Sequence, residues 1–120
     1  MSVRRQTLIL VVEDEALVRQ CAVAQLEDAG FAVIEAADAE EALRSFKDHA
    51  AVTTVFTDIN MPGEFDGLSL AHQISQLRPG VQLILTSGRG APLERELPVG
   101  GKFLLKPYDC NHLTALIKAA

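Results

Sequence analysis

Five short apolar runs divide the chain, and each has the length of a β-strand. They cover residues 8–12, 31–35, 52–57, 81–86 and 102–105. The runs are nearly continuous and rich in Val, Ile, Leu and Phe, which is typical of strands that are buried on both faces. We therefore expect a parallel sheet that is covered by helices on both sides.

Between the first four runs, apolar residues recur at intervals of three and four, the period of a helix that packs one face on a core. The three stripes consist of Val18, Cys21, Ala22, Leu26 and Ala29, then Ala39, Ala42, Leu43, Phe46 and Ala50, then Leu70, Ala71, Ile74 and Leu77. Asp38 and Asp66 stand at the N-cap positions of the second and third helices. Gly30 follows the first helix as a stop. Cys21, on the first stripe, is expected in the core.

The fourth connection differs from the others. Residues 90–98 contain two prolines and three charged residues, so we expect at most two helical turns there. A last helix is predicted to begin after Asp109 and to bury Leu113, Leu116 and Ile117. This alternation predicts an α/β, flavodoxin-like (βα)5 three-layer sandwich. Its parallel five-stranded sheet has the order 2-1-3-4-5, and its fourth helix is shortened.

Polar residues stand where four of the predicted strands end. Glu13 and Asp14 follow the first run, and Asp58 follows the third. Ser87 follows the fourth run and Lys106 the fifth. The carboxyl ends of parallel strands share one edge, and the ligand crevice of this strand order lies between the first and third strands. We therefore expect these five side chains to form one site.

Three converging carboxylates repel one another unless a cation joins them. Mg²⁺ is the expected ion, because it is hard, takes few carboxylates and keeps water ligands for a phosphate. Asp14 and Asp58 are the predicted direct ligands, and Glu13 acts directly or through water. The backbone carbonyl of Asn60 is a further candidate ligand. The alternative is that residues 13–15 only form a solvated helix entry, and on this ground Glu15 is left out of the site.

Asp58 is the candidate nucleophile, since a carboxylate can attack phosphorus and form an acyl phosphate. The transfer then depends on positioning and on neutralising the phosphoryl oxygens. We assign this neutralisation to Mg²⁺, Lys106 and Ser87, while Gly88 leaves space for close approach. Taken singly, Ser87 and Lys106 are ordinary loop and surface residues, and only their joint placement supports the assignment. A cis bond before Pro107 would aim Lys106 across the sheet edge.

Composition argues against several other classes of function. The 120 residues predict one domain, residues 1–120. A net charge of −5 with scattered basic residues argues against a nucleic-acid surface. No run approaches the roughly 18 apolar residues of a membrane span, and two cysteines suit reduced thiols. We expect a cytoplasmic protein that binds neither nucleic acid nor membrane. The three histidines receive no role, and His72 is expected to face water.

With these positions in place, the chain resembles the receiver domain of two-component response regulators, CheY-like receivers included. The motifs that carry this resemblance are the acidic pair within residues 10–15, the segment 57–62 with Asp66-Gly67 behind it, Ser87-Gly88 and Lys106-Pro107. The resemblance implies that Asp58 takes a phosphoryl group from a sensor histidine kinase or a histidine phosphotransfer protein, and that Mg²⁺ is required. It also implies that the Ser87 hydroxyl moves towards the phosphoryl oxygens and that Phe103 is a switch aromatic that turns inward on activation.

The chain departs from the family pattern in several places, including a short last helix. Ser87 stands where Thr is more usual, and preferring it to Thr86 rests on the glycine that follows. The loop at residues 63–65 is one residue longer than is typical. The stretch from Ser87 to Lys106 is several residues shorter, which puts the usual coupling between Ser87 and Phe103 in question.

The leading hypothesis is a phosphoacceptor rather than an enzyme, either a stand-alone regulator or the receiver of a longer protein. It would act through an unknown downstream protein or through phosphoryl relay. An aspartyl-phosphate phosphohydrolase would need a general acid where the chain has Asn60. A flavodoxin-type nucleotide binder would need a phosphate-binding loop, but residues 13–15 are acidic and lack glycine. A degenerate receiver that acts as a phosphorylation-independent scaffold is the remaining alternative.

Overall fold

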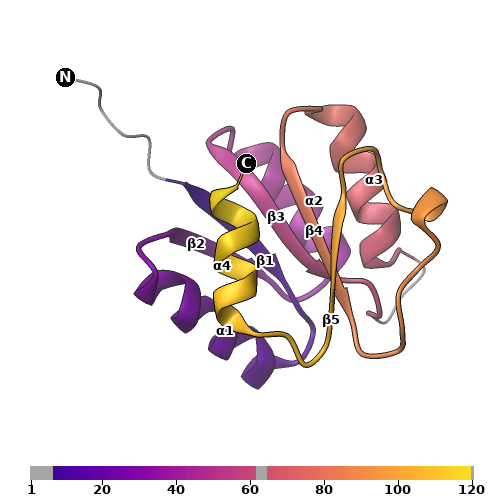
Figure 1. Ribbon diagram of the computed structural model, residues 1–120. Coiled ribbons are helices and arrows are strands. Elements are labelled where there is room, and N and C mark those ends of the chain that lie inside the picture. Colours follow the sequence, from indigo (N-terminus) through magenta and orange to yellow (C-terminus); the bar gives the residue numbers. More distant parts are fainter. Residues whose placement is uncertain (1–6, 62–64, 120) are drawn as a thin grey trace.

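The computed structural model describes residues 7–61 and 65–119. Its five strands form one parallel sheet in the order β2-β1-β3-β4-β5 (Figure 1). The strands are β1 (Leu8–Val12), β2 (Ala32–Ala36), β3 (Val52–Asp58), β4 (Gln82–Ser87) and β5 (Lys102–Leu105). The predicted strand order is confirmed. Of the predicted longer loop, Gly63 and Glu64 lie outside the described residues, as does the adjoining Pro62.

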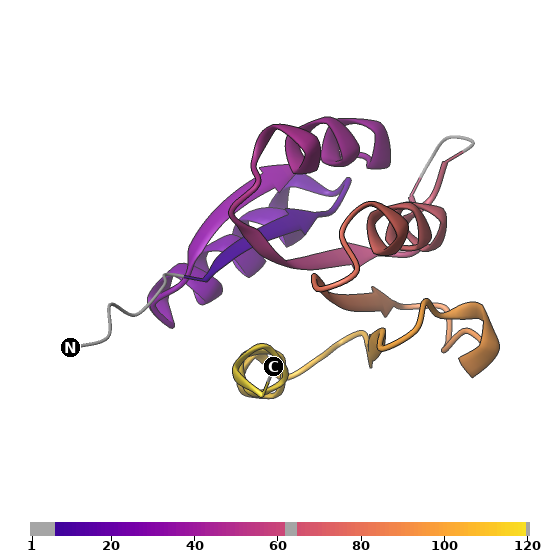
Figure 2. The ribbon, with the colours of Figure 1, turned by 90° about the horizontal axis from the view of Figure 1, so that it is seen from above.

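Four α-helices cover the two faces of the sheet. They are α1 (Ala16–Asp28), α2 (Ala39–Asp48), α3 (Gly67–Leu77) and α4 (Cys110–Lys118). One core packs α2 and α3 against the sheet, and a second core packs α1 and α4 against its other face. Figure 2 shows the sheet as the middle of these three layers. The predicted three-layer sandwich is therefore confirmed.

Strand β1 explains why the apolar runs are continuous. Leu10 and Val12 belong to the core beneath α2 and α3. Ile9 and Val11 alternate with them and belong to the core beneath α1 and α4. Because successive side chains point to opposite faces of the sheet, both faces of β1 meet a core, and its apolar run is continuous.

The helix boundaries follow the predicted caps. Asp38 accepts a hydrogen bond from the Glu41 N–H at 2.8 Å, and Asp66 accepts one from the Ser69 N–H at 2.9 Å. Gly30 follows α1 with φ +96°, a conformation that glycine adopts without a steric cost. These side-chain and backbone signals begin and end the helices as the sequence predicts.

Helix α1 is rotated slightly from the predicted orientation. Ala22 and Leu26 are its buried residues, whereas Cys21 is exposed and lines a surface groove with Leu17 and Tyr108. The prediction that Cys21 lies in the core is therefore wrong. The apolar stripe on α1 is wider than the row that contacts the sheet, so Cys21, at the edge of the stripe, stays outside.

The fourth connection contains η1 (Glu94–Glu96), a single turn of 3-10 helix. This confirms the shortened fourth helix. The turn is attached to α3, because Nε2 of His72 lies 2.6 Å from the carbonyl oxygen of Glu96. His72 is exposed, as predicted, but its ring also forms this contact. Across residues 7–61 and 65–119, no helix combines the length and the apolar character that crossing a membrane requires.

Candidate functional site

The strand ends bring the predicted polar residues to one edge of the sheet. Thr57 pairs with Val12 across β1 and β3, so the next residues along the two strands are Asp58 and Glu13. Ser87, at the end of β4, pairs with Leu105, and Lys106 follows directly. Parallel register thus converts four strand ends that are distant in the sequence into one constellation.

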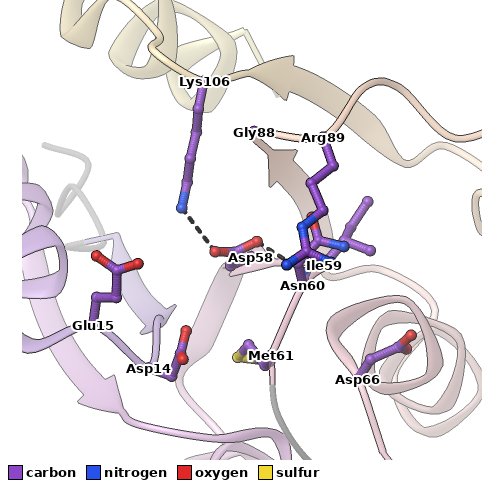
Figure 3. Close-up of a pocket in the computed structure, with 10 residues that line it drawn as sticks. All are labelled: Asp14, Glu15, Asp58, Ile59, Asn60, Met61, Asp66, Gly88, Arg89 and Lys106. Carbon is purple, nitrogen blue, oxygen red and sulfur yellow. Dashed lines mark hydrogen bonds and ion pairs between the residues drawn. The ribbon is translucent and has the colours of Figure 1, made fainter.

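Lys106 joins the two buried carboxylates of this constellation. Its Nζ lies 2.8 Å from Oε1 of Glu13 and 2.7 Å from Oδ2 of Asp58, and Figure 3 shows the second contact. Glu13 is 4% exposed and Asp58 is 6% exposed. Two carboxylates this deeply buried require a counter-charge, and Lys106 supplies it.

Burial and ion pairing act in opposite directions on the pKa values of Glu13 and Lys106. Burial raises the pKa of Glu13, and the hydrogen bonds from Lys106 and from the Glu15 N–H only partly counteract it. Burial alone would lower the pKa of Lys106, but its hydrogen bonds to Asp58 and Glu13 outweigh that effect and raise the pKa above its ordinary value. Lys106 is therefore an ammonium at neutral pH.

The second oxygen of Asp58 is also held. Oδ1 accepts a hydrogen bond from the Asn60 N–H at 2.9 Å (Figure 3). Behind it, Gly67 begins α3 and packs directly on the end of β3. A Cβ atom at residue 67 would overlap the backbone carbonyl oxygen of Asp58. The glycine is therefore required for α3 to support Asp58, a role that the sequence motif alone did not reveal.

Glu13, Asp14 and Asp58 form a cluster of hard donors. Each offers a carboxylate oxygen, and these oxygens all lie within 4.8 Å of one another. Asp14 is exposed and lines the adjoining cavity of about 770 Å³. Few carboxylates beside open, water-accessible space suit Mg²⁺, which keeps several water ligands. The donor set therefore fits the predicted ion.

Ser87 contacts the segment that follows Asp58. Its hydroxyl donates to Oδ1 of Asn60 and accepts a hydrogen bond from the Arg89 N–H at 3.0 Å. Within the described part of the chain, the buried Oγ1 of neighbouring Thr86 has no hydrogen-bond partner. Of the two hydroxyls considered from the sequence, Ser87 is thus the one linked to the Asp58 loop.

The remaining predicted residues lie around this edge. Gly88 lies beside Lys106, since a Cβ atom at residue 88 would be 3.9 Å from the Cβ of Lys106. Phe103 is half-buried and packs against the core beneath α2 and α3. The bond between Lys106 and Pro107 is cis, the geometry considered from the sequence.

Several residues of the site were not predicted. The cavity is lined by Asp14, Glu15, Asp58, Ile59, Asn60, Met61, Asp66, Gly88, Arg89 and Lys106 (Figure 3). Glu15, which the sequence argument left out, is among them.

Arg89 was missed, although its place two residues after Ser87 was a signal. Arg19 was missed as well: its guanidinium donates to the Glu13 carbonyl at 2.7 Å and pairs with Glu35 at 2.9 Å, which orients the acidic loop.

The chain is similar in sequence to proteins of known family. Residues 9–118 match the family model described as response regulator receiver domain. The chain is 35% identical over 114 residues to sensor kinase CckA of Brucella abortus (strain 2308), covering 92% of this chain and 12% of that protein. It is 34% identical to the C4-dicarboxylate transport transcriptional regulatory protein DctD of Rhizobium meliloti (strain 1021), covering 93% of this chain and 25% of that protein.

The chain therefore spans a quarter or less of the length of these two relatives. Among solved structures, a response regulator receiver protein from Sinorhizobium medicae WSM419 is similar with a TM-score of 0.88 and 28% sequence identity. That similarity covers 95% of this chain and 93% of the other. The similarity to receiver domains, in sequence and in structure, thus extends over nearly the whole chain.

Proposed function

The chain belongs to the response regulator receiver domain family, and from this membership we propose that it is a phosphoacceptor in a two-component system or phosphorelay. Asp58 takes the phosphoryl group from a phosphohistidine of a sensor histidine kinase or a histidine phosphotransfer protein. The phosphorylated state then alters the binding of a partner or passes the group on. The observation that carries the proposal is the buried Asp58 carboxylate, held by Lys106 and by the Asn60 N–H beside an open acidic cavity.

In the proposed transfer, a carboxylate oxygen of Asp58 bonds to phosphorus while the bond between phosphorus and the donor imidazole nitrogen breaks. The imidazole keeps the electron pair of that bond and is protonated. Lys106 already contacts Asp58, so its ammonium is positioned to neutralise negative charge as the phosphoryl group arrives.

The proposed metal ligands are Glu13, Asp14, Asp58 and the backbone carbonyl of Asn60. When bound there, Mg²⁺ would supply positive charge to a phosphoryl oxygen. Oε1 of Glu13 is bonded to Lys106, and its Oε2 accepts a hydrogen bond from the Glu15 N–H at 3.1 Å. Because both carboxylate oxygens of Glu13 already accept hydrogen bonds, we propose that Glu13 contacts the ion through a bound water molecule. Asp14 is exposed to the cavity and is proposed as a direct ligand.

The proposed response to phosphorylation involves Ser87 and Phe103. The Ser87 hydroxyl would leave Asn60 and donate to a phosphoryl oxygen, with Gly88 giving that oxygen room. Phe103 would complete its burial and turn further inward. Between β4 and β5 the chain has only the single 3-10 turn η1. The proposed movement of Ser87 and Phe103 would therefore alter a surface formed by this turn rather than by a full helix. The cytoplasmic location, and the expectation of no contact with nucleic acid or membrane, stay predictions.

The test is intact-protein mass spectrometry after incubation with acetyl phosphate, with and without Mg²⁺, on the wild type and on Asp58→Asn. We expect one added phosphoryl group that depends on both Mg²⁺ and Asp58. A stable, stoichiometric adduct on Asp58→Asn would mean that the acceptor is another residue. If the wild type neither gains a phosphoryl group nor binds beryllofluoride, the phosphoacceptor proposal fails and the scaffold function becomes the better one.

A further inference from the structure

We propose that Arg89 is a second phosphoryl-binding cation of the site, which contacts the phosphoryl group on Asp58 from the end of β4. This inference rests on the proposed function, since it assigns a further residue to the same site. Arg89 lines the same cavity as Asp58 and Lys106. Figure 3 shows its side chain extending from the loop after β4 towards Ile59 and Asn60, the residues that follow Asp58.

The backbone of Arg89 is fixed relative to the proposed switch residue. Its N–H donates to the Ser87 hydroxyl at 3.0 Å, and that hydroxyl bonds to Asn60. Gly88 and Gly90 flank Arg89 in the sequence, so neither adjacent residue has a side chain that competes for the cavity. The position is thus anchored by its backbone, while the guanidinium remains exposed and able to reach a ligand.

The cavity is lined by more acidic than basic side chains, so a further cation would favour the binding of a phosphoryl group there. Among the described residues, Asp14, Glu15, Asp58 and Asp66 line the cavity, and the cations that line it are Lys106 and Arg89. Lys106 is engaged with Glu13 and Asp58. Within the described residues, the Arg89 guanidinium takes part in none of the ion pairs.

A phosphoryl group brings about two negative charges where a carboxylate carried one, so phosphorylation makes an acidic cavity more acidic. Mg²⁺, when bound, and Lys106 would offset part of this charge, and among the described residues Arg89 is the remaining cation at the cavity. Arginine suits the task because its planar guanidinium presents several N–H donors that match the oxygens of a phosphoryl group. The same positive charge would also attract an anionic phosphodonor through the screened field of the cavity.

The test uses beryllofluoride, which mimics the phosphoryl group on an aspartate, at saturating Mg²⁺. Its affinity is measured by fluorine NMR for the wild type, Arg89→Gln, Arg89→Lys and Arg95→Gln. Arg95 is a matched control, because it is exposed in η1 and does not line the cavity. We expect Arg89→Gln to weaken beryllofluoride binding by about three- to tenfold, as for a partly screened charged contact. Arg89→Lys should be intermediate and Arg95→Gln unchanged.

A second measurement follows the rate of phosphorylation by acetyl phosphate as the salt concentration rises. The wild-type rate should fall more steeply with salt than the rate of Arg89→Gln, because the variant lacks the charge that is screened. Unchanged beryllofluoride affinity in Arg89→Gln, or an equal loss in Arg95→Gln, would overturn the role of Arg89 and leave the phosphoacceptor function intact. A wild type that binds no beryllofluoride and gains no phosphoryl group would overturn both proposals.

Discussion

The two halves of the site edge are built in different ways. Where β1 and β3 end, the Glu13 and Asp58 carboxylates are buried and all four of their oxygens have a hydrogen-bond partner. Between β4 and β5, one 3-10 turn replaces a helix, and Leu93 and Val99 are 55% and 98% exposed. The first half, at the ends of β1 and β3, is a buried cluster in which every oxygen of these two carboxylates accepts a hydrogen bond. The second half, between β4 and β5, is a short and exposed connection.

The difference shows which parts of the fold position the chemistry. Ser87 and Lys106 stand at the two ends of the short connection, yet they are held directly to each other. The Lys106 N–H donates to the Ser87 carbonyl at 2.9 Å, and the preceding residue, Leu105, is paired with Ser87 in the sheet. Because the sheet sets the distance between these two residues, the segment between them can shorten without displacing the site.

The largest effect on folding is expected in the first half, from Gly67→Ala. The added methyl group would overlap the Asp58 carbonyl oxygen, so α3 and the end of β3 must separate. We expect a loss of about 2–4 kcal/mol in the free energy of unfolding, measured with urea. The control is Gly80→Ala, where an added Cβ has no atom within 4 Å. Equal effects of the two substitutions would show that the support of Asp58 by α3 is not a tight contact.

The second prediction removes the shared counter-ion. Lys106→Met should lower the metal-free stability by about 1–3 kcal/mol at pH 8, because Glu13 and Asp58 are left buried and unpaired. The exposed Lys47→Met should change it by less than about 0.5 kcal/mol. Folding raises the pKa of Glu13, so the protonated carboxyl favours the folded state and stability is lost as pH rises through that pKa.

Lys106 lowers the pKa of Glu13 through its hydrogen bond, so that pKa should be raised further in Lys106→Met. The variant should then gain more from protonation than the wild type, and its deficit should narrow as the pH is lowered from 8 towards 5. Urea unfolding at several pH values measures this trend. A deficit that stays constant over that range would indicate that Lys106 stabilises the fold through the packing of its alkyl chain and not through its charge. Addition of Mg²⁺ should also narrow the deficit, since the ion supplies positive charge to the same carboxylates.

Asp14→Ala tests the exposed member of the acidic cluster. We expect Mg²⁺ affinity, measured by calorimetry, to fall by about tenfold or more, and the melting temperature without metal to stay equal or rise as repulsion is removed. Glu15→Ala, a substitution in the same cavity but outside the cluster, should weaken Mg²⁺ less. The reverse order of the two variants would contradict the assignment of ligands. A lower melting temperature of metal-free Asp14→Ala would contradict the argument from repulsion.

The smallest effect is expected in the second half, from His72→Ala. This substitution removes the contact with the Glu96 carbonyl and should cost about 0.5–1 kcal/mol. Amide hydrogen exchange should accelerate at Glu96 and Leu97, whose N–H groups bond within η1, while protection of the Asn60 N–H stays unchanged. Faster exchange at Asn60 would mean that the two halves of the edge are coupled after all. Gln73→Ala, at the neighbouring exposed position, is the control.

The sequence predicted the strands and the site edge because both depend on simple regularities. Continuous apolar runs indicate buried strands, and polar residues after parallel strands meet at one edge. The orientation of α1 was harder, because a small rotation of the helix decides whether Cys21 is buried, and the stripe tolerates either orientation. The packing role of Gly67 and the position of Arg89 in the cavity were missed for another reason: both depend on the path of loops, which no periodicity encodes.

The hydrogen bond between the Lys106 N–H and the Ser87 carbonyl also has a consequence for protein engineering. A segment whose two ends are already held by the sheet adds little closure cost when it is lengthened, because the entropy of a loop grows slowly with its length. Val99, which is almost fully exposed, marks the place where a foreign peptide or a reporter module can be grafted. A graft there would sit between Ser87 and Phe103, the two residues proposed to respond to phosphorylation, which would make the chain a scaffold for a phosphorylation biosensor.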